Sequence, residues 1–402
     1  MKQAWIVVTA CAIGLAFSIS PVYFQTFGLF IKPMAAEFGW GRTQLSAAVS
    51  MAALGGAWAA PIVGRAVDRF GPRRVVLVST AAFSTVLALL YFLPARYPLY
   101  LAMAVIIGFV GTGCTMISYM SVLPRWFSAK LGTSFAFAVS GIGIGQFAMP
   151  FYANWLLHAL GWRLAYIALA ISVLVITVPN AVFLLRDAPQ SHRSVAALDD
   201  AKSNGISYQQ ALRMPVFWRL AALVLLVTIA TTAFMVHIVP LLTDRGVHTA
   251  DATSAAAFMG IAALAGRFVV GVLLDYLNAA LLGFLSFAGC AAGVLLIASG
   301  IHGVPVYLGV ILVGVGLGAE NDLLPFVVRR VFGIRSYSTI YGSLFVAFTV
   351  GLVIGPLLLG FAFDVSGNYD LGLQIVFTLA TIAALLWLPG LPVATSSTRT
   401  AA

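Results

Sequence analysis

The sequence predicts an all-α membrane protein with twelve transmembrane helices in two pseudo-symmetric six-helix bundles. Of its 402 residues, 61% are hydrophobic and 8% are charged, whereas about 25% are charged in an ordinary soluble protein. Apolar runs of transmembrane length, about 18 residues or more, follow one another along nearly the whole chain, and the mean hydropathy is +1.03. The first half of the chain also resembles the second half. These observations exclude a soluble domain.

Polar or turn-forming residues divide the chain into twelve apolar spans. Helices are expected in each, because lipid offers the backbone no hydrogen-bond partners. The spans lie at about 5–31, 44–65, 74–94, 98–122, 134–157, 163–185, 217–240, 252–274, 280–300, 304–328, 338–363 and 371–390. The first apolar run is too long for a cleaved signal peptide, so we expect it to stay as a helix. We expect an N-terminal bundle at 1–185, a cytoplasmic linker at 186–216 and a C-terminal bundle at 217–402.

The two halves match each other without gaps over long stretches. A shift of 207 residues pairs Pro33 with Pro240, Glu37 with Asp244, Gly39 with Gly246, Gly64 with Gly271 and Asp68 with Asp275. A proline pair and two acid pairs in one register are not expected by chance. The chain therefore contains an internal duplication of six helices.

The basic residues predict the orientation of the helices. Predicted loops on the side of the amino terminus contain sixteen Lys and Arg, and loops on the opposite side contain five. Cytoplasmic loops are enriched in basic residues. Both termini are therefore expected in the cytoplasm, with the protein in the cell (inner) membrane.

Composition also bears on partners and cofactors. In a membrane protein a net charge of +10 is explained by basic loops, so a nucleic-acid partner is not expected. Cys11, Cys114 and Cys290 lie in separate apolar spans, with no disulfide or metal-ligand spacing. No nucleotide-binding loop and no nucleophile–base pair is recognisable. We expect no enzyme, no metal and no cofactor, and we expect a monomer.

A loop motif lies between the second and third spans. Residues 64–74 read GRAVDRFGPRR, and GVLLD at 271–275 is a weaker copy in the second half. With the twelve spans and the duplication, this pattern resembles the signature of the major facilitator superfamily. The resemblance implies two bundles that rock around a site near the membrane midplane. It also implies a cytoplasmic gate formed by the motif residues Gly64, Asp68, Arg69, Gly71, Arg73 and Arg74, in which Asp68 can pair with nearby basic residues.

Ionisable residues inside transmembrane spans are functional candidates. The second half has four, His237, Arg267, Glu320 and Asp322, and Asp244 lies just beyond the seventh span. Arg267 is the only Lys or Arg well inside a span. Its planar guanidinium matches a carboxylate, so it is a candidate for binding an anionic substrate. The alternatives are an internal salt bridge to Glu320 or Asp322, or a part in the second-half gate motif.

A narrower resemblance concerns bacterial monocarboxylate and oxalate/formate-type transporters. It rests on EFGWGRTQLS (37–46), RWFSAK (125–130), GWR (161–163), ALRMPVFWRL (211–220) and GAENDLLPFVVRRVFGIRSYSTIYG (318–342). The resemblance implies that Arg267, four residues before Gly271, binds the substrate carboxylate. It also implies that His237 and Tyr119 line the pocket. From the residues alone, the alternatives for His237 are a proton relay or a structural hydrogen-bonding group, and the alternative for Tyr119 is an ordinary packed aromatic residue.

Two departures from that family limit the comparison. Animal members have a lysine in the first helix and an aspartate one turn before the arginine, where this chain has Gln25 and Ala263. The basic residue that oxalate exchangers carry in the eleventh helix is absent from 338–363. A single buried cation suits one carboxylate better than two.

Glu320 and Asp322 are candidates for proton coupling, together with Asp244. Residues two apart in a helix point about 200° apart, so the two carboxylates cannot face the same side. One of them is a candidate to titrate while the other pairs structurally, and the alternative is that they form ion pairs that hold the bundle together. The predicted function is proton-coupled transport of a small organic anion by alternating access. The sequence leaves open a multidrug or metabolite exporter of the same fold and a transport-inactive sensor or scramblase.

Overall fold

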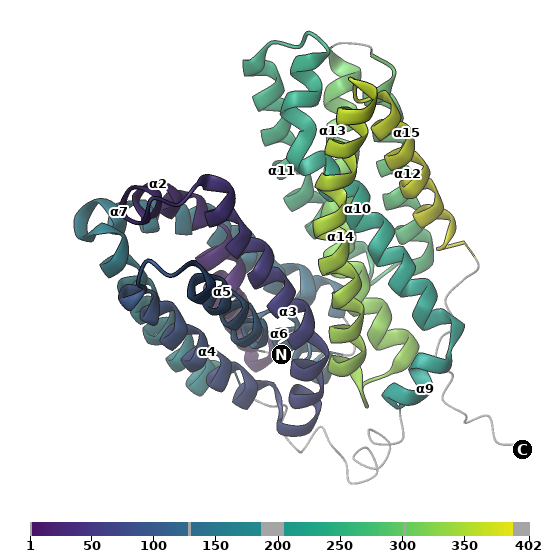
Figure 1. Ribbon diagram of the computed structural model, residues 1–402. Coiled ribbons are helices and arrows are strands. Elements are labelled where there is room, and N and C mark those ends of the chain that lie inside the picture. Colours follow the sequence, from purple (N-terminus) through teal and green to yellow (C-terminus); the bar gives the residue numbers. More distant parts are fainter. Residues whose placement is uncertain (1, 128–129, 186–204, 301–302, 389–402) are drawn as a thin grey trace, which may run out of the picture. The chain divides into compact units, whose positions relative to one another are not determined.

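The computed structural model describes residues 2–127, 130–185, 205–300 and 303–388, and every regular element within these ranges is a helix (Figure 1). Seven helices correspond to single predicted spans. They are α3 (Arg42–Phe70), α4 (Pro72–Leu89), α10 (Pro215–Asp244), α11 (Thr249–Leu273), α12 (Ala279–Ala298), α13 (Val304–Phe332) and α14 (Tyr337–Ser366).

The remaining spans are longer, shorter or broken. The first contains α1 (Lys2–Ala16) and α2 (Phe27–Phe38), and the fourth contains α5 (Tyr97–Gly111) and α6 (Met116–Tyr119). The long α7 (Leu131–Pro179) holds two helices, because Gly161 turns the backbone at φ 76°, a conformation that glycine adopts without strain. The last is α15 (Asp370–Leu385). Counted this way, the described helices match the twelve predicted spans, and the predicted fold class is confirmed.

The first and fourth spans were predicted as continuous helices, and the structure corrects this. A π-helical turn at Ser20–Phe24 separates α1 from α2, since Pro21 has no N–H to continue the ladder. After α5 the chain becomes extended at Thr115 (φ −97°, ψ −174°). There the Thr115 hydroxyl donates a 2.6 Å hydrogen bond to the carbonyl of Thr112, a local bond that competes with the helix.

The chain forms two compact units, each with its own apolar core. Unit 1 comprises Met1–Ser128, Phe137–Ser203 and Ile334–Val346, and unit 2 comprises Ala129–Ala136, Asn204–Gly333 and Ala347–Ala402. Each unit thus includes one short segment from the other half of the sequence. Of the predicted linker at 186–216, residues 186–204 lie outside the described residues. The described part contains α9 (Tyr208–Arg213) and the start of α10.

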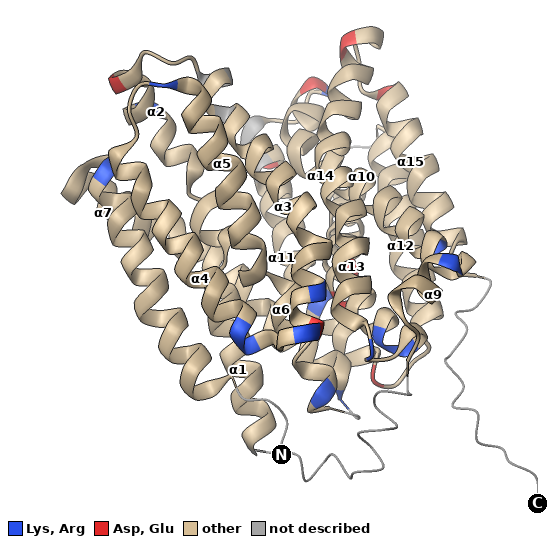
Figure 2. Cartoon of the chain, turned by 60° about the horizontal axis from the view of Figure 1, so that its bottom comes forward, with Lys and Arg blue, Asp and Glu red and all other residues tan. Residues whose placement is uncertain are grey.

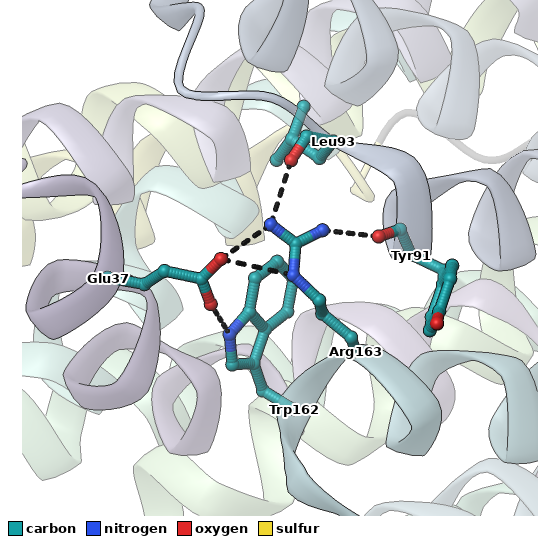
Figure 3. A network of polar contacts seen from close by, with 5 residues as sticks. All are labelled: Glu37, Tyr91, Leu93, Trp162 and Arg163. Atoms are coloured by element: carbon teal, nitrogen blue, oxygen red, sulfur yellow. Dashed lines mark hydrogen bonds and ion pairs between the residues drawn. The ribbon is translucent and has the colours of Figure 1, made fainter.

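An arginine joins three helix ends in unit 1 (Figure 3). Arg163 forms a 2.6 Å salt bridge with Glu37 near the end of α2. Its guanidinium also donates to the carbonyl oxygens of Tyr91 and Leu93, which follow α4. The indole of Trp162 donates a 2.6 Å hydrogen bond to the same carboxylate. The first, third and sixth spans are therefore held together at one end.

Unit 2 has an equivalent contact with the charges reversed. Arg245, directly after α10, forms a 2.7 Å salt bridge with Asp370 at the start of α15. Arg245 also donates to the carbonyl of Ile297 near the end of α12. The 207-residue shift places Arg163 on Asp370 but Glu37 on Asp244, one residue before Arg245, so the two units join corresponding helix ends by a salt bridge of opposite polarity that is offset by one residue.

Most charged residues lie at or near helix ends (Figure 2), as expected for helices whose middle parts cross lipid. Ten described segments are long and apolar enough to cross a membrane. This count treats Leu131–Leu184 as one segment and places α15 among shorter apolar helices.

Candidate functional site

Helices α11 and α13 of unit 2 touch through glycines. A Cβ atom added to Gly318 would lie 2.9 Å from the backbone nitrogen of Arg267. A Cβ added to Gly314 would lie 2.9 Å from the Cβ of Ala262, and one at Gly266 would lie 2.8 Å from the Cα of Val315. Small residues allow such close approach between transmembrane helices. The backbone of Arg267 is therefore held directly against α13.

Asp322 lies one helical turn beyond Gly318, on the side of α13 that faces Arg267. Helical side chains lean toward the helix N-terminus, which brings the Asp322 carboxylate back toward the level of Arg267. The two groups interact electrostatically. Asp322 is completely buried, and neither of its carboxylate oxygens has a hydrogen-bond partner within the described part of the chain. Arg267 itself is half-buried, with its Nε atom inaccessible.

Glu320 faces a different helix, as the spacing of the two acids predicts. The Thr228 hydroxyl of α10 hydrogen-bonds to Oε1 of Glu320, and Glu320 is 4% exposed. Cys290 of α12 lies on the same side, because it interacts electrostatically with Glu320 and its Cβ would be 3.0 Å from a Cβ added to Gly316. The contact with Thr228 and the proximity of Cys290 were not predicted, since neither residue type marks a site in an apolar span.

His237 joins α10 to α14 and to the turn before α15. Its Nε2 lies 3.0 Å from the carbonyl oxygen of Pro356, and its Nδ1 lies 3.3 Å from the hydroxyl of Tyr369. Asp244, exposed at the end of α10, lies near the same tyrosine. Burial raises the pKa of Tyr369, and the carboxylates of Asp244 and Asp364 raise it further. His237, Tyr369 and Asp244 therefore form one polar group at this end of unit 2.

Tyr119 belongs to unit 1 and is completely buried. Its ring occupies the space beside Gly14 of α1, where a Cβ atom would overlap the phenol. Its hydroxyl has no hydrogen-bond partner among the described residues. The break in the fourth span places Tyr119 in this position, because α6 starts anew after Thr115.

The aspartate of the loop motif at 64–74 binds the N-terminus of a helix. Asp68 accepts hydrogen bonds from the backbone N–H groups of Ser338 (3.1 Å) and Thr339 (2.8 Å) and from the Thr339 hydroxyl (2.6 Å). These groups begin α14, where a carboxylate stabilises the helix dipole. A Cβ atom at Gly64 would overlap the backbone of Ser338, which explains the motif glycine.

The second half repeats this arrangement at the start of α7. Asp275 accepts from the N–H groups of Gly132 (2.7 Å) and Thr133 (3.0 Å) and from the Thr133 hydroxyl (2.6 Å). The weaker motif at 271–275 thus has the same geometry as the stronger one. The sequence-based expectation that Asp68 pairs with basic residues did not anticipate either helix terminus.

The other motif residues have separate contacts. Gly71 turns the chain between α3 and α4 at φ 85°. Arg73 donates a 2.7 Å hydrogen bond to the carbonyl of Val182, in the π-helical turn Asn180–Leu184. Arg69 lies over the ring of Phe70 at 5.2 Å, and Arg74 is exposed.

A cavity of about 480 Å³ lies where α10, α11 and α13 begin or end in unit 2. Its polar lining includes His248, Asp251 and Tyr307. The cavity was not predicted, because its polar residues come from the starts of two helices, α11 and α13, that are far apart in the sequence. In the described ranges no three His, Cys, Asp or Glu side chains are grouped to hold a metal ion.

The family follows from comparison with known proteins. A sequence profile of the Major Facilitator Superfamily matches residues 6–356. The chain belongs to the major facilitator superfamily. It is therefore a multi-pass membrane transporter. The predicted resemblance to the superfamily is confirmed.

Similar proteins include several transporters. The chain is 24% identical to the uncharacterized MFS-type transporter YhjX of Escherichia coli, over 84% of this chain and 83% of that protein. It is 25% identical to monocarboxylate transporter 13 of Bos taurus (91% and 85%) and to monocarboxylate transporter 11 of Homo sapiens (96% and 83%).

Solved structures confirm the fold. The proton:xylose symporter XylE superposes with a TM-score of 0.74 at 14% identity, covering 98% of this chain and 96% of XylE. The human organic anion transporter MFSD10 gives 0.71 at 14% identity, covering 96% and 99%.

Proposed function

We propose that this superfamily member is a secondary transporter of small monocarboxylates, driven by protons and working by alternating access. It acts as a monomer in the cytoplasmic (inner) membrane, with both termini in the cytoplasm. Arg267 binds the substrate carboxylate, and a carboxylate of α13 carries the proton. Tyr119, His237 and Asp244 are the further candidates for lining the pocket or relaying the proton.

The observation that supports this best is the pairing of Arg267 with a buried acid. A guanidinium inside a membrane protein persists only with partners for its charge, and its donors match a carboxylate in a bidentate arrangement. Here the facing group is Asp322, and Arg267 is half-buried while Asp322 is completely buried. Arg267 thus has an acid partner in the protein, and a substrate carboxylate of the same chemistry can take the place of that partner.

The relatives support the same substrate class. Two of them are named monocarboxylate transporters and align over 91% and 96% of this chain. Gln25 and Ala263 stand where the animal family has a lysine and an aspartate, so this chain lacks that proton relay. Helix α13 supplies two buried acids as candidates for that task, Glu320 and Asp322, and Asp322 is the one that interacts with Arg267.

The two loop motifs fit alternating access. Asp68 and Asp275 each hold a helix that belongs, by sequence, to the opposite half of the chain. Breaking both contacts would free the two halves to move, whereas neither contact involves Arg267. We infer that the motifs control switching and leave substrate recognition to unit 2.

The test is uptake by the purified chain in proteoliposomes, with radiolabelled L-lactate, pyruvate, acetate and benzoate. At least one acid should accumulate faster than in protein-free liposomes when the outside is more acidic than the lumen, and should not accumulate without the gradient. Exporters of neutral or cationic drugs and inactive sensors would add nothing to the passive entry of protonated acid that protein-free liposomes show. That result would refute the proposed function.

A further inference from the structure

We propose that Asp322 is the residue whose protonation makes Arg267 available to a substrate carboxylate, and that Glu320 remains a neutral structural residue. This assignment rests on the proposed function and goes beyond it, because it separates two acids that the sequence leaves equivalent.

The surroundings of Asp322 leave its charge dependent on a single cation. The side chain is 0% exposed, and neither oxygen has a hydrogen-bond partner in the described ranges. A buried carboxylate without hydrogen bonds is strongly unfavourable, so the ionised form depends on the nearby Arg267.

A substrate would compete for the same guanidinium. If Arg267 faced a substrate carboxylate and an ionised Asp322 together, one negative charge would lack a positive partner in a low-dielectric site. Protonation of Asp322 removes that charge and releases the guanidinium. Substrate and proton should therefore bind together, and affinity should be highest at low pH and fall as the pH rises.

Glu320 has different surroundings, because one of its oxygens, Oε1, contacts a hydroxyl, while Oε2 has no hydrogen-bond partner among the described residues. The Thr228 hydroxyl lies 2.7 Å from the carbonyl oxygen of Val224 and also contacts Oε1 of Glu320. A hydroxyl has one hydrogen to donate. The Thr228 hydroxyl therefore shares its proton between Val224 and an ionised Glu320, or donates to Val224 alone and accepts from a protonated Glu320. Since Oε2 has no hydrogen-bond partner among the described residues, a neutral acid that ties α13 to α10 fits these surroundings better than a carboxylate.

Other titratable groups around α13 do not replace this pair. Helix α11 contributes Arg267, and α12 contributes Cys290, which interacts with Glu320. On α10, His237 is engaged with Pro356 and Tyr369. The basic residues of α13 itself, Arg329 and Arg330, lie in its last turn.

The experiment compares wild type with Asp322→Asn and Glu320→Gln, which neutralise equally buried acids two residues apart. Equilibrium binding of the same four acids is measured to the purified full-length protein from mildly acidic to mildly alkaline pH. Wild-type affinity should fall about tenfold per pH unit above the titration of Asp322. Asp322→Asn should bind tightly with no pH dependence, whereas Glu320→Gln should keep the wild-type slope.

Several outcomes would overturn the assignment. One is a wild-type slope in Asp322→Asn, and another is a flat profile in Glu320→Gln. If wild type binds none of the acids, the proposed function fails. In that case infrared difference spectra between acidic and alkaline pH test the role of Asp322 without a substrate. The assignment predicts a titrating carboxyl band that is absent from Asp322→Asn and present in Glu320→Gln. Asp322→Ser provides a second neutral variant if Asp322→Asn does not fold.

Discussion

Substitution of Gly318 by alanine should damage the site without touching any charged group. The added Cβ would overlap the carbonyl oxygen of Ala263 and lie 2.9 Å from the Arg267 nitrogen, whereas ordinary contacts begin at 3.4 Å. Both neighbours are backbone atoms and cannot rotate away, so α11 and α13 must separate by more than half an ångström. Overpacking of this kind costs about 1–3 kcal/mol.

Gly260→Ala is the matched control, since a Cβ atom at Gly260 has nothing within 4 Å. Both variants gain the higher helix propensity of alanine, about 1 kcal/mol in soluble helices, so that contribution cancels in the comparison. Gly318→Ala should show a lower thermal unfolding temperature than Gly260→Ala. Its carboxylate affinity should fall about tenfold, equal to about 1.4 kcal/mol. Wild-type affinity and stability in Gly318→Ala would refute the claim that this helix contact positions Arg267.

The other predictions concern switching, orientation and stability. Asp68→Asn should slow transport and leave substrate affinity within a few fold, because Asp68 contacts the start of α14 and not Arg267; a large loss of equilibrium binding by the folded variant would contradict a gating role. Single cysteines introduced between residues 190 and 203 should resist an impermeant thiol reagent added to intact cells, as the charge bias of the loops implies; efficient external labelling would reverse the orientation. Arg163→Gln removes the salt bridge to Glu37 and two bonds to carbonyl groups, so it should cost about 2 kcal/mol of stability without changing substrate preference; unchanged thermal unfolding would show that this contact is not stabilising.

The sequence predicted most of the fold, because hydrophobic length alone defines a membrane-spanning helix. It did not predict the breaks at Ser20–Phe24 and Thr115. Both depend on how a local proline or hydroxyl competes with the helical ladder. Such competition does not change the average hydropathy of a span, so a hydropathy pattern cannot reveal it.

The candidate site was predicted in part. The spacing of Glu320 and Asp322 indicated that they face different sides, yet only the structure shows which one faces Arg267 and which contacts Thr228. Helix rotation decides this, and the small residues on several faces of α13 left its rotation undetermined. The binding role of Arg267 remains a prediction.

The contacts of Arg163 and Arg245 were absent from the predictions for a different reason. Each joins helix ends that are far apart in the sequence, and the shift that aligns Arg163 with Asp370 does not align Glu37 with Arg245. Asp68 was found by its motif. Its partners at the start of α14 are about 270 residues away, beyond the reach of a local pattern.

The central claim is that Arg267 recognises a carboxylate, and the most direct test compares binding of an acid with binding of its neutral amide. Benzoate and benzamide have nearly the same shape and differ in charge. Wild type should bind benzoate, or whichever of the four acids it transports, far better than the matching amide. Arg267→Gln should lose this preference, because removing one partner of a desolvated charge pair costs about 2–5 kcal/mol. Arg267→Lys should restore it only in part, since lysine keeps the charge and loses the planar fork. A folded Arg267→Gln protein that binds the acid with wild-type affinity and still rejects the amide would contradict the account.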